Sequence, residues 1–338
     1  MDPVEALEEV ATLLERKLAA PYKVQAFRRA ADAVGDVPAD ELEGLAARGR
    51  LQDLPRVGSS TASVIAQALT GQVPEYLARL RAEDAPDAGP GAPIRAALRG
   101  DLHLHSDWSD GGSAIDTMAR HAAELGHEYI ALTDHSPTLT VAKGLTADRL
   151  RRQLEVVAQL NEELAPFRIL TGIEVDILED GTLDQEEDLL AELDVVVASV
   201  HSKLRMPAQP MTDRMVAALA NPHSDILGHC TGRMVMGRGR PESQFDSQLV
   251  FGAAAHFDKA VEINCRPERL DPPMRLLKEV VDAGGKVSID SDAHAPGQLE
   301  WQPYGCARAA EAELPVERIV NTWEREPLLD WTGSHEAA

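Results

Sequence analysis

The sequence predicts an α/β protein in which a closed, or nearly closed, parallel barrel follows a small all-α domain. Three observations carry this prediction. Short apolar runs alternate with helical stretches about every 30 residues from residue 100 onward. Most of these runs carry His, Asp or Glu near their C-terminal end. Residues 2–80 instead show helical periodicity and end before a stretch rich in Pro and Gly.

The composition fits a globular chain with two domains. The 338 residues are 44% hydrophobic and 26% charged, and this length allows one barrel-sized domain and a smaller one. The net charge is -23; residues 1–82 carry 10 Lys+Arg against 12 Asp+Glu, a net of -2, which leaves -21 for residues 83–338. Such an acidic surface repels nucleic acid, but clustered carboxylates suit divalent cations.

The chain shows no signal for export or for a membrane. Cys230, Cys265 and Cys306 are an odd set without CxxC spacing, which argues against a disulfide framework and indicates a reducing compartment. The first residues, MDPVEALEEV, contain no apolar signal segment, and the sequence nowhere approaches 18 consecutive apolar residues. We therefore expect a cytoplasmic protein without a membrane span.

The first domain, residues 1–82, is expected to contain several helices. The periodicity places them at 2–18, 24–35, 41–49 and 61–71. The segment LQDLPRVGSS forms a Pro and Gly turn between the last two. Residues 83–98 are expected to be a linker, because EDAPDAGPGAP at their start lacks periodicity.

The barrel domain, residues 99–338, is expected to contain seven strands. The apolar runs are DLHLHS (101–106), YIALTDH (129–135), RILTGIEVDIL (168–178), VVVASVHS (195–202), DILGHC (225–230), AVEINC (260–265) and KVSIDSDAH (286–294). Strands that alternate with helices at this repeat form parallel sheets, and seven such units suffice for a barrel.

Polar residues lie at or near the C-terminal ends of six of the seven runs. They are His103, His105, His135, Glu174, His201, His229, Asp292 and His294, whereas AVEINC ends in Asn264 and Cys265. The C-terminal strand ends of an α/β barrel converge on one face, so these side chains should surround one pocket. Within the first run, the two histidines alternate onto one side of the strand.

An HxH pair alone is weak evidence for a metal site, because histidines on a half-buried strand usually make ordinary hydrogen bonds. The distribution of the 11 histidines favours metal binding, since six lie at strand ends. The other five lie in predicted helices, at helix ends or in the tail: His121, His127, His223, His256 and His335. Imidazole with carboxylate ligands suits zinc, manganese or iron, and enough ligands are present for two or three ions.

The motifs HxHxxxxSDG, TDHS, GIEVDI, ASVHS, GHCTGR and SDAH, in this order, resemble the polymerase and histidinol phosphatase (PHP) superfamily of metal-dependent phosphoesterases. The resemblance extends from about residue 99 to about residue 323. The strings NPHSDILGHCTGR and AVEINCRPERLDPP look most like the C-terminal PHP domain of bacterial family X DNA polymerases.

This resemblance implies a distorted (β/α)7 barrel that holds three divalent ions, Mn²⁺, Zn²⁺ or Fe²⁺. It assigns His103, His105, Glu174 and Asp292 to one ion, Glu174, His201 and His229 to a second, and Asp110, His135 and His294 to the third. Asp107 matches no ligand of the family. A pair of such ions would activate water to attack a phosphate ester.

Basic residues near the strand ends are candidates for binding the substrate phosphate. They are Arg233, Lys203, and Arg266 or Arg269, because a guanidinium matches phosphate oxygens in a bidentate manner. The alternative for each is an ordinary surface ion pair. Asn264 either faces the pocket or caps the turn after its strand.

The segment LPRVGSSTASVIAQALTG is similar to the helix-hairpin-helix element of family X polymerases, which implies DNA binding by Arg56, Gly58, Ser59 and Ser60. Such a hairpin presents backbone N–H groups to a DNA phosphate. Arg56 stands where the first hairpin glycine would be. A helical packing or dimerisation module is the alternative, given the near-neutral charge of this domain.

Two activities of the family X polymerases are not expected. Val64 aligns with the lysine that forms the Schiff base in members with lyase activity, and valine cannot form an imine. A polymerase palm needs on the order of 100 residues. Fewer than 20 residues separate the two domains here. We therefore expect neither lyase activity nor nucleotidyl transfer.

The leading hypothesis is a metal-dependent phosphoesterase that processes DNA, as a 3′–5′ exonuclease or a related repair nuclease. The alternative is a phosphatase of the histidinol-phosphatase type that acts on a small phosphate ester, which the acidic barrel favours. A third hypothesis is a non-catalytic DNA-binding or assembly protein with structural metals. The sequence leaves the oligomeric state open.

Overall fold

The computed structural model describes residues 1–83 and 85–335. Residue 84 of the expected linker and residues 336–338 of the expected barrel domain therefore lie outside the described residues. The chain divides into two compact units, Met1–Ala85 and Pro86–Ala338. Each unit has its own hydrophobic core, and each is described by itself below.

The first unit is helical, as predicted. Its helices are α1 (Pro3–Arg16), α2 (Pro21–Gly35), α3 (Ala39–Ala47), α4 (Ser59–Leu69) and α5 (Glu75–Ala82). Asp2 caps α1, because its side chain accepts hydrogen bonds from the backbone N–H groups of Val4 and Glu5. The helix α5 was not among the four expected helices; its Leu77 and Leu80 are buried in the core of this unit.

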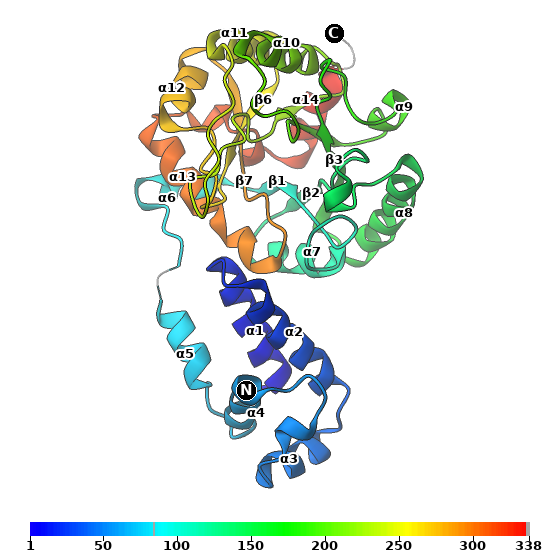
Figure 1. Cartoon of the computed structure of the whole chain (residues 1–338), viewed down its shortest axis with the longest axis vertical. Coiled ribbons are helices and arrows are strands. Elements are labelled where there is room, and N and C mark those ends of the chain that lie inside the picture. Colours follow the sequence, from blue (N-terminus) through cyan, green and yellow to red (C-terminus); the bar gives the residue numbers. More distant parts are fainter. Residues whose placement is uncertain (84, 336–338) are drawn as a thin grey trace. The chain divides into compact units, whose positions relative to one another are not determined.

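The second unit contains seven parallel strands in the order β1 to β7, which confirms the predicted barrel class (Figure 1). The strands are β1 (Gly100–Leu104), β2 (Tyr129–Leu132), β3 (Arg168–Asp176), β4 (Val195–Ser199), β5 (Ile226–Leu227), β6 (Ala260–Asn264) and β7 (Lys286–Asp290). A parallel bridge between Leu104 and Ala293 joins the two ends of the sheet, and the His105 N–H donates to the Ala293 carbonyl over 2.8 Å. The barrel is thus nearly closed.

Helices enclose the strands (Figure 1). They are α6 (Ala92–Ala97), α7 (Ile115–Glu124), α8 (Ala147–Glu163), α9 (Glu187–Leu190), α10 (Ala208–Leu219), α11 (Ser247–His256), α12 (Met274–Asp282), α13 (Gln302–Glu311) and α14 (Arg325–Ser334). In one core cluster, Met118 of α7 and Val157 of α8 pack with strand residues such as Ile130. Apolar packing therefore holds the outer helices on the sheet, as sequence periodicity requires.

The N-terminal ends of the strands are covered by α14. Trp331 and Leu328 of this helix share a core cluster with Tyr129 and Val195, the first residues of β2 and β4. This end is largely apolar, and its buried polar groups include the pair Asp225 and His335, whose Oδ1 and Nδ1 atoms lie 2.7 Å apart.

The expected linker is partly helical. Helix α6 occupies residues 92–97, and the preceding Gly91 packs against α13 so closely that a Cβ atom there would lie 2.3 Å from the Cys306 carbonyl group. Only glycine permits this approach. The second half of the Pro- and Gly-rich stretch therefore belongs to the barrel unit.

Among the described helices, none combines the length and the apolar composition needed to cross a membrane.

We predict that His127 makes the barrel unit less stable in mild acid. This side chain is 5% exposed, both ring nitrogens lack a hydrogen-bond partner among the described residues, and burial lowers its pKa to about 3. The unfolded chain protonates it near its ordinary pKa of about 6.5, so the unfolded state binds more protons between these values and stability falls as the pH falls. From pH 7 to pH 5 the loss should be about 2 kcal/mol.

Chemical unfolding at pH 7 and pH 5 tests this prediction. His127→Leu should lose about 2 kcal/mol less on acidification than the wild type, whereas His256→Leu, which changes an exposed histidine, should match the wild type. Equal losses in all three proteins would contradict it.

Candidate metal centre

The predicted polar residues converge at the C-terminal ends of the strands. Most are buried: His103 and His105 are 0% exposed, and Glu174 is 1% exposed. Groups of His, Asp and Glu that could hold a metal ion occur three times among the described residues, and within each group the candidate ligand atoms lie within 4.8 Å of one another.

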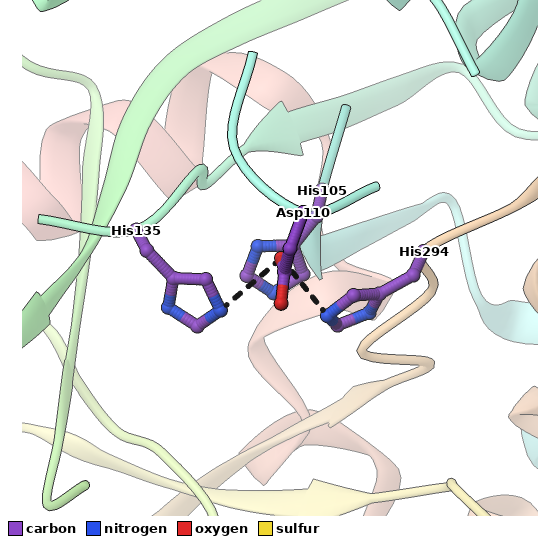
Figure 2. Close-up of side chains that lie close together, drawn as sticks. All are labelled: His105, Asp110, His135 and His294. Atoms are coloured by element: carbon purple, nitrogen blue, oxygen red, sulfur yellow. Dashed lines mark ion pairs between the residues drawn. The ribbon is translucent and has the colours of Figure 1, made fainter. Parts of the chain in front are cut away.

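The first group consists of His105, Asp110, His135 and His294 (Figure 2). The Oδ1 atom of Asp110 lies 3.5 Å from His135 Nε2 and 3.3 Å from His294 Nε2. The ring of His105 lies between them, with centroid distances of 4.4 Å to His135 and 4.2 Å to His294. The three expected ligands of one ion are therefore together, with His105 added.

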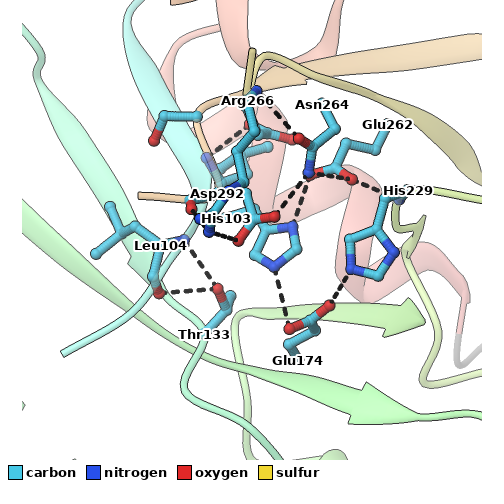
Figure 3. A network of polar contacts seen from close by, with 12 residues as sticks. His103, Leu104, Thr133, Glu174, His229, Glu262, Asn264, Arg266 and Asp292 are labelled. Carbon is cyan, nitrogen blue, oxygen red and sulfur yellow. Dashed lines mark hydrogen bonds and ion pairs between the residues drawn. The ribbon is translucent and has the colours of Figure 1, made fainter. Parts of the chain in front are cut away.

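The other two groups share Glu174. They are His103 with His105 and Glu174, and His135 with Glu174 and His201. The Oε2 atom of Glu174 lies 3.4 Å from His103 Nε2, and its Oε1 atom lies 2.8 Å from His229 Nε2 (Figure 3). Glu174 thus reaches ligands of two expected ions, as a bridging carboxylate should.

Asp292 joins the cluster from the segment after β7. Its Oδ1 atom lies 3.4 Å from His105 Nε2. Its φ angle of 52° falls in the left-handed region that disfavours side chains other than glycine.

The chemistry of the donor atoms fits divalent metal ions. Several buried polar atoms have no hydrogen-bond partner among the described residues, including His103 Nε2, both ring nitrogens of His105 and Glu174 Oε2. Buried polar atoms without partners are costly, and a metal ion would satisfy them. Mixed imidazole and carboxylate ligands suit zinc, manganese and iron.

The charges in the cluster depend on one another. Burial raises the pKa of Glu174, but His201, His103 and His135 more than offset it and hold the pKa well below the ordinary value. Burial and the neighbouring His294 and His135 lower the pKa of His105 well below its ordinary value. Burial lowers the pKa of His103 and His201, but Glu174 and other nearby carboxylates more than offset it, so that the pKa of His103 lies well above its ordinary value and that of His201 rises to about 9. A divalent cation that binds these two rings would therefore displace protons from them.

The candidate phosphate-binding residues divide into two pairs. Arg266 and Arg269 face the cluster: Arg266 Nη1 lies 2.9 Å from His294 Nδ1, and Arg269 Nε lies 3.3 Å from Asp292 Oδ2. Arg233 instead donates to the backbone carbonyls of Arg269 and Leu270. Lys203 is largely exposed, and its Nζ atom lies 3.6 Å from Glu179 Oε1.

Asn264 is fully buried, and it both faces the pocket and caps the turn after its strand, the two roles between which the sequence did not decide. Its Nδ2 group donates to Asp292 Oδ2 over 3.0 Å, and its Oδ1 atom accepts from the backbone N–H of Arg266 over 3.1 Å. It therefore contacts the cluster and also fixes the turn after β6 (Figure 3).

Sequence reasoning missed two buried carboxylates that support the cluster. Glu262 contacts His103 Nδ1 over 2.6 Å, and Asp176 Oδ1 accepts from the His201 N–H over 3.0 Å. Both lie within strands rather than after them. The signal that was available is spacing: each lies two residues from a residue already considered, Asn264 or Glu174, and so on the same side of its strand.

The predicted hairpin residues lie in the segment between α3 and α4 and at the start of α4. Arg56 has a φ angle of 67°, so an arginine occupies a conformation that glycine favours. Gly58 is the N-cap of α4, and Ser59 and Ser60 are its first residues and are exposed. The first backbone N–H groups of a helix have no partner within it and suit an anion.

A cavity of about 860 Å³ adjoins this helix start. Its lining includes Lys23, Arg79, Tyr76, Phe27 and the three residues 58–60. Phe27 and Tyr76 are stacked with ring centroids 5.6 Å apart, and the Arg79 guanidinium lies 4.9 Å from the Tyr76 centroid. The lining thus combines aromatic and basic side chains with the acidic Glu75.

Comparisons with known proteins agree with both units. Residues 101–285 match the PHP domain family, and residues 1–73 match the helix-hairpin-helix domain family. The chain is 40% identical over 224 residues to the DNA polymerase/3′-5′ exonuclease PolX of Bacillus subtilis, covering 66% of this chain and 39% of that protein. The chain therefore spans well under half of that relative.

Two further matches involve phosphatases. A protein of Thermoanaerobacter sp. (strain X514), named a probable phosphatase, is 32% identical over 233 residues, which cover 66% of this chain and 89% of that protein. The crystal structure of histidinol phosphate phosphatase from Lactococcus lactis matches with a TM-score of 0.45 and 20% identity, covering 64% of this chain and 94% of that chain.

We predict that metal ions stabilise the barrel unit through this cluster. Dialysis against a chelator should lower the melting temperature by several degrees, and added Mn²⁺ or Zn²⁺ should restore it, because a ligand at 100 times its Kd contributes about 2.7 kcal/mol. Differential scanning calorimetry with elemental analysis measures both quantities.

The same loop supplies a matched pair of variants for this test. Asp110→Ala should bind less metal per chain, whereas Asp107→Ala, which changes an exposed aspartate outside the three groups, should bind as much as the wild type. Equal metal content in the two variants would contradict the assignment of Asp110.

Proposed function

This chain belongs to the PHP domain family, and from this premise we propose that it is a metal-dependent phosphoesterase that processes DNA, as a 3′–5′ exonuclease or a related repair nuclease. One observation carries the proposal: a cluster of buried metal-ligand side chains and a hairpin unit suited to nucleic acid occur in the same chain. The name of the B. subtilis relative, which includes a 3′-5′ exonuclease, supports the same choice.

In this proposal nine residues hold three divalent ions. They are His103, His105, Asp110, His135, Glu174, His201, His229, Asp292 and His294. When bound, Mn²⁺, Zn²⁺ or Fe²⁺ would supply a water of lowered pKa as nucleophile and would offset negative charge on the phosphoryl oxygens. The protein contributes a mostly buried set of ligands, with Glu174 at its centre and Asp110 exposed at its edge.

Two arginines are placed to bind the substrate phosphate. Arg269 forms an ion pair with Asp292 through Nε, and its Nη1 atom is buried, lacks a hydrogen-bond partner among the described residues and could donate to a phosphate oxygen. Arg266 lies beside His294 and Asp292 and adds a second guanidinium. Positive charge held close to the cluster compensates locally for the net charge of -23, which opposes the approach of DNA.

The hairpin would hold the DNA strand whose end is cut. The exposed start of α4 offers backbone N–H groups to a phosphate, and Arg56 adds a positive charge beside it. Val64 is 1% exposed in the core of this unit, so we propose no lyase activity there. Nor do we propose nucleotidyl transfer, since the barrel unit follows the helical unit directly in the chain.

We also propose a cytoplasmic location. Cys230, Cys265 and Cys306 are free and buried, and burial raises the pKa of each thiol. Unpaired thiols suit a reducing compartment, and buried thiols of raised pKa are inert.

A phosphatase that acts on a small phosphate ester, of the histidinol-phosphatase type, is the second candidate. It is favoured by the relative named a probable phosphatase, because this chain covers 89% of that protein. The acidic barrel also favours a small substrate over DNA. In this case the helical unit would serve another purpose, such as packing.

We predict Mn²⁺-dependent release of nucleotides from a 3′-labelled oligonucleotide by the purified full chain. His103→Ala should lower the rate at least about 100-fold, because loss of one ligand disrupts both the metals and the activated water. A parallel panel of phosphomonoesters measures release of inorganic phosphate. Turnover of a monoester with no release of nucleotides would contradict the nuclease and support the second candidate.

We further predict that the hairpin contributes to the binding of polymeric substrates and not to the binding of phosphomonoesters. Arg56→Glu should raise the KM for the oligonucleotide several-fold, because a negative charge beside the phosphate opposes binding, and should leave phosphomonoester hydrolysis unchanged. Arg325→Glu makes the same change in charge at an exposed position of the barrel unit and is the control. Equal effects of the two variants on KM would argue against the hairpin.

A further inference from the structure

Glu262 is a fully buried carboxylate that the proposed metal set does not use. It lies within β6, the strand whose sequence run lacks a predicted metal ligand at its end. Among the described residues, no Lys or Arg forms an ion pair with it. Burying a carboxylate without a Lys or Arg partner costs folding free energy. The residues that hydrogen-bond to Glu262 should therefore indicate its role.

The neighbours of Glu262 are two of the proposed ligands. Its Oε1 atom lies 2.6 Å from His103 Nδ1. Its Oε2 atom accepts from the His229 backbone N–H over 2.5 Å and from Asn264 Nδ2 over 3.3 Å. One side chain therefore links the end of β1 to the segment after β5 (Figure 3).

The contact with His103 determines which ring nitrogen faces the cluster. With its Nδ1–H donating to Glu262, the neutral ring carries its lone pair on Nε2. That Nε2 atom is buried, has no hydrogen-bond partner among the described residues, and lies 3.4 Å from Glu174 Oε2. Carboxylates that orient a metal-binding histidine in this way also make the ring a stronger ligand.

We propose that Glu262 is a positioning residue of the metal centre: it holds His103 in the tautomer that presents Nε2 to a metal ion and fixes the backbone of His229 beside it. This inference rests on the proposed metal centre and does not depend on which phosphate ester is the substrate.

An amide cannot replace this carboxylate. The glutamine of Glu262→Gln has one acceptor oxygen for three donors, His103 Nδ1–H, the His229 backbone N–H and Asn264 Nδ2. If the oxygen faces His229, the NH₂ group faces His103 and favours the tautomer with hydrogen on Nε2, which cannot bind a metal there. If the oxygen faces His103, the NH₂ group opposes the His229 N–H. Either arrangement weakens the site while changing the side-chain volume little.

The experiment is a titration of metal-free full chain with Zn²⁺ in competition with a chromophoric chelator. Glu262→Gln should weaken the tightest affinity about 10- to 100-fold. Asp225→Asn is the matched control: Asp225 is 4% exposed in the same barrel and accepts from the Val196 N–H over 2.8 Å, but its partner is His335 rather than a proposed ligand. This control should lose stability and keep the wild-type Zn²⁺ affinity.

A measurement on the wild type keeps the inference testable even if Glu262→Gln folds poorly. Nitrogen-15 NMR of the histidine rings in the Zn²⁺-loaded full chain, with His103 assigned through His103→Gln, should show hydrogen on Nδ1 of His103 and none on Nε2. Hydrogen on Nε2, or a Zn²⁺ affinity of Glu262→Gln within about twofold of the control, would overturn the proposal. Because neither readout uses hydrolysis, failure of the proposed function would be seen separately, in the nucleotide-release assay.

Discussion

The buried carboxylate of Glu174 is the interaction on which the rest of the site depends. Five imidazoles lie within 4 Å of its two oxygens: His103, His105, His135, His201 and His229. Each comes from the end of a strand or from the segment just after it, so the barrel must close with the right order and register for these contacts to form. The fold is therefore a prerequisite for the chemistry, because only a parallel barrel brings these strand ends to one place.

Two features of the barrel distinguish the end that holds this charged cluster from the opposite end. At one end, α14 and the first residues of the strands form an apolar cluster. At the other end, carboxylates and imidazoles face one another without enough hydrogen bonds to satisfy them. Such an arrangement is costly in a bare protein, and it becomes favourable when divalent cations complete the coordination.

The sequence predicted the barrel and most of the cluster for a definable reason. Strand ends that carry His, Asp or Glu can be recognised along the chain. Side chains alternate between the two faces of a strand, which places His103 and His105 on the same side. Contacts that depend on three-dimensional neighbours could not be read in this way. Glu262 lies inside a strand, where a buried carboxylate has no pattern of its own, and its partner His103 lies 159 residues away. The exposed position of Lys203 likewise depends on a loop whose conformation its residue types do not specify. Helix α6 was missed because its packing against α13 outweighs the local tendency of Pro and Gly to form a loop.

Anomalous X-ray diffraction from crystals grown with Mn²⁺ tests the central claim most directly. The account predicts strong anomalous peaks beside the Glu174 carboxylate, between it and the surrounding imidazoles, and a further peak among Asp110, His135 and His294. Peaks confined to surface carboxylates, with none beside Glu174 at saturating Mn²⁺, would contradict it.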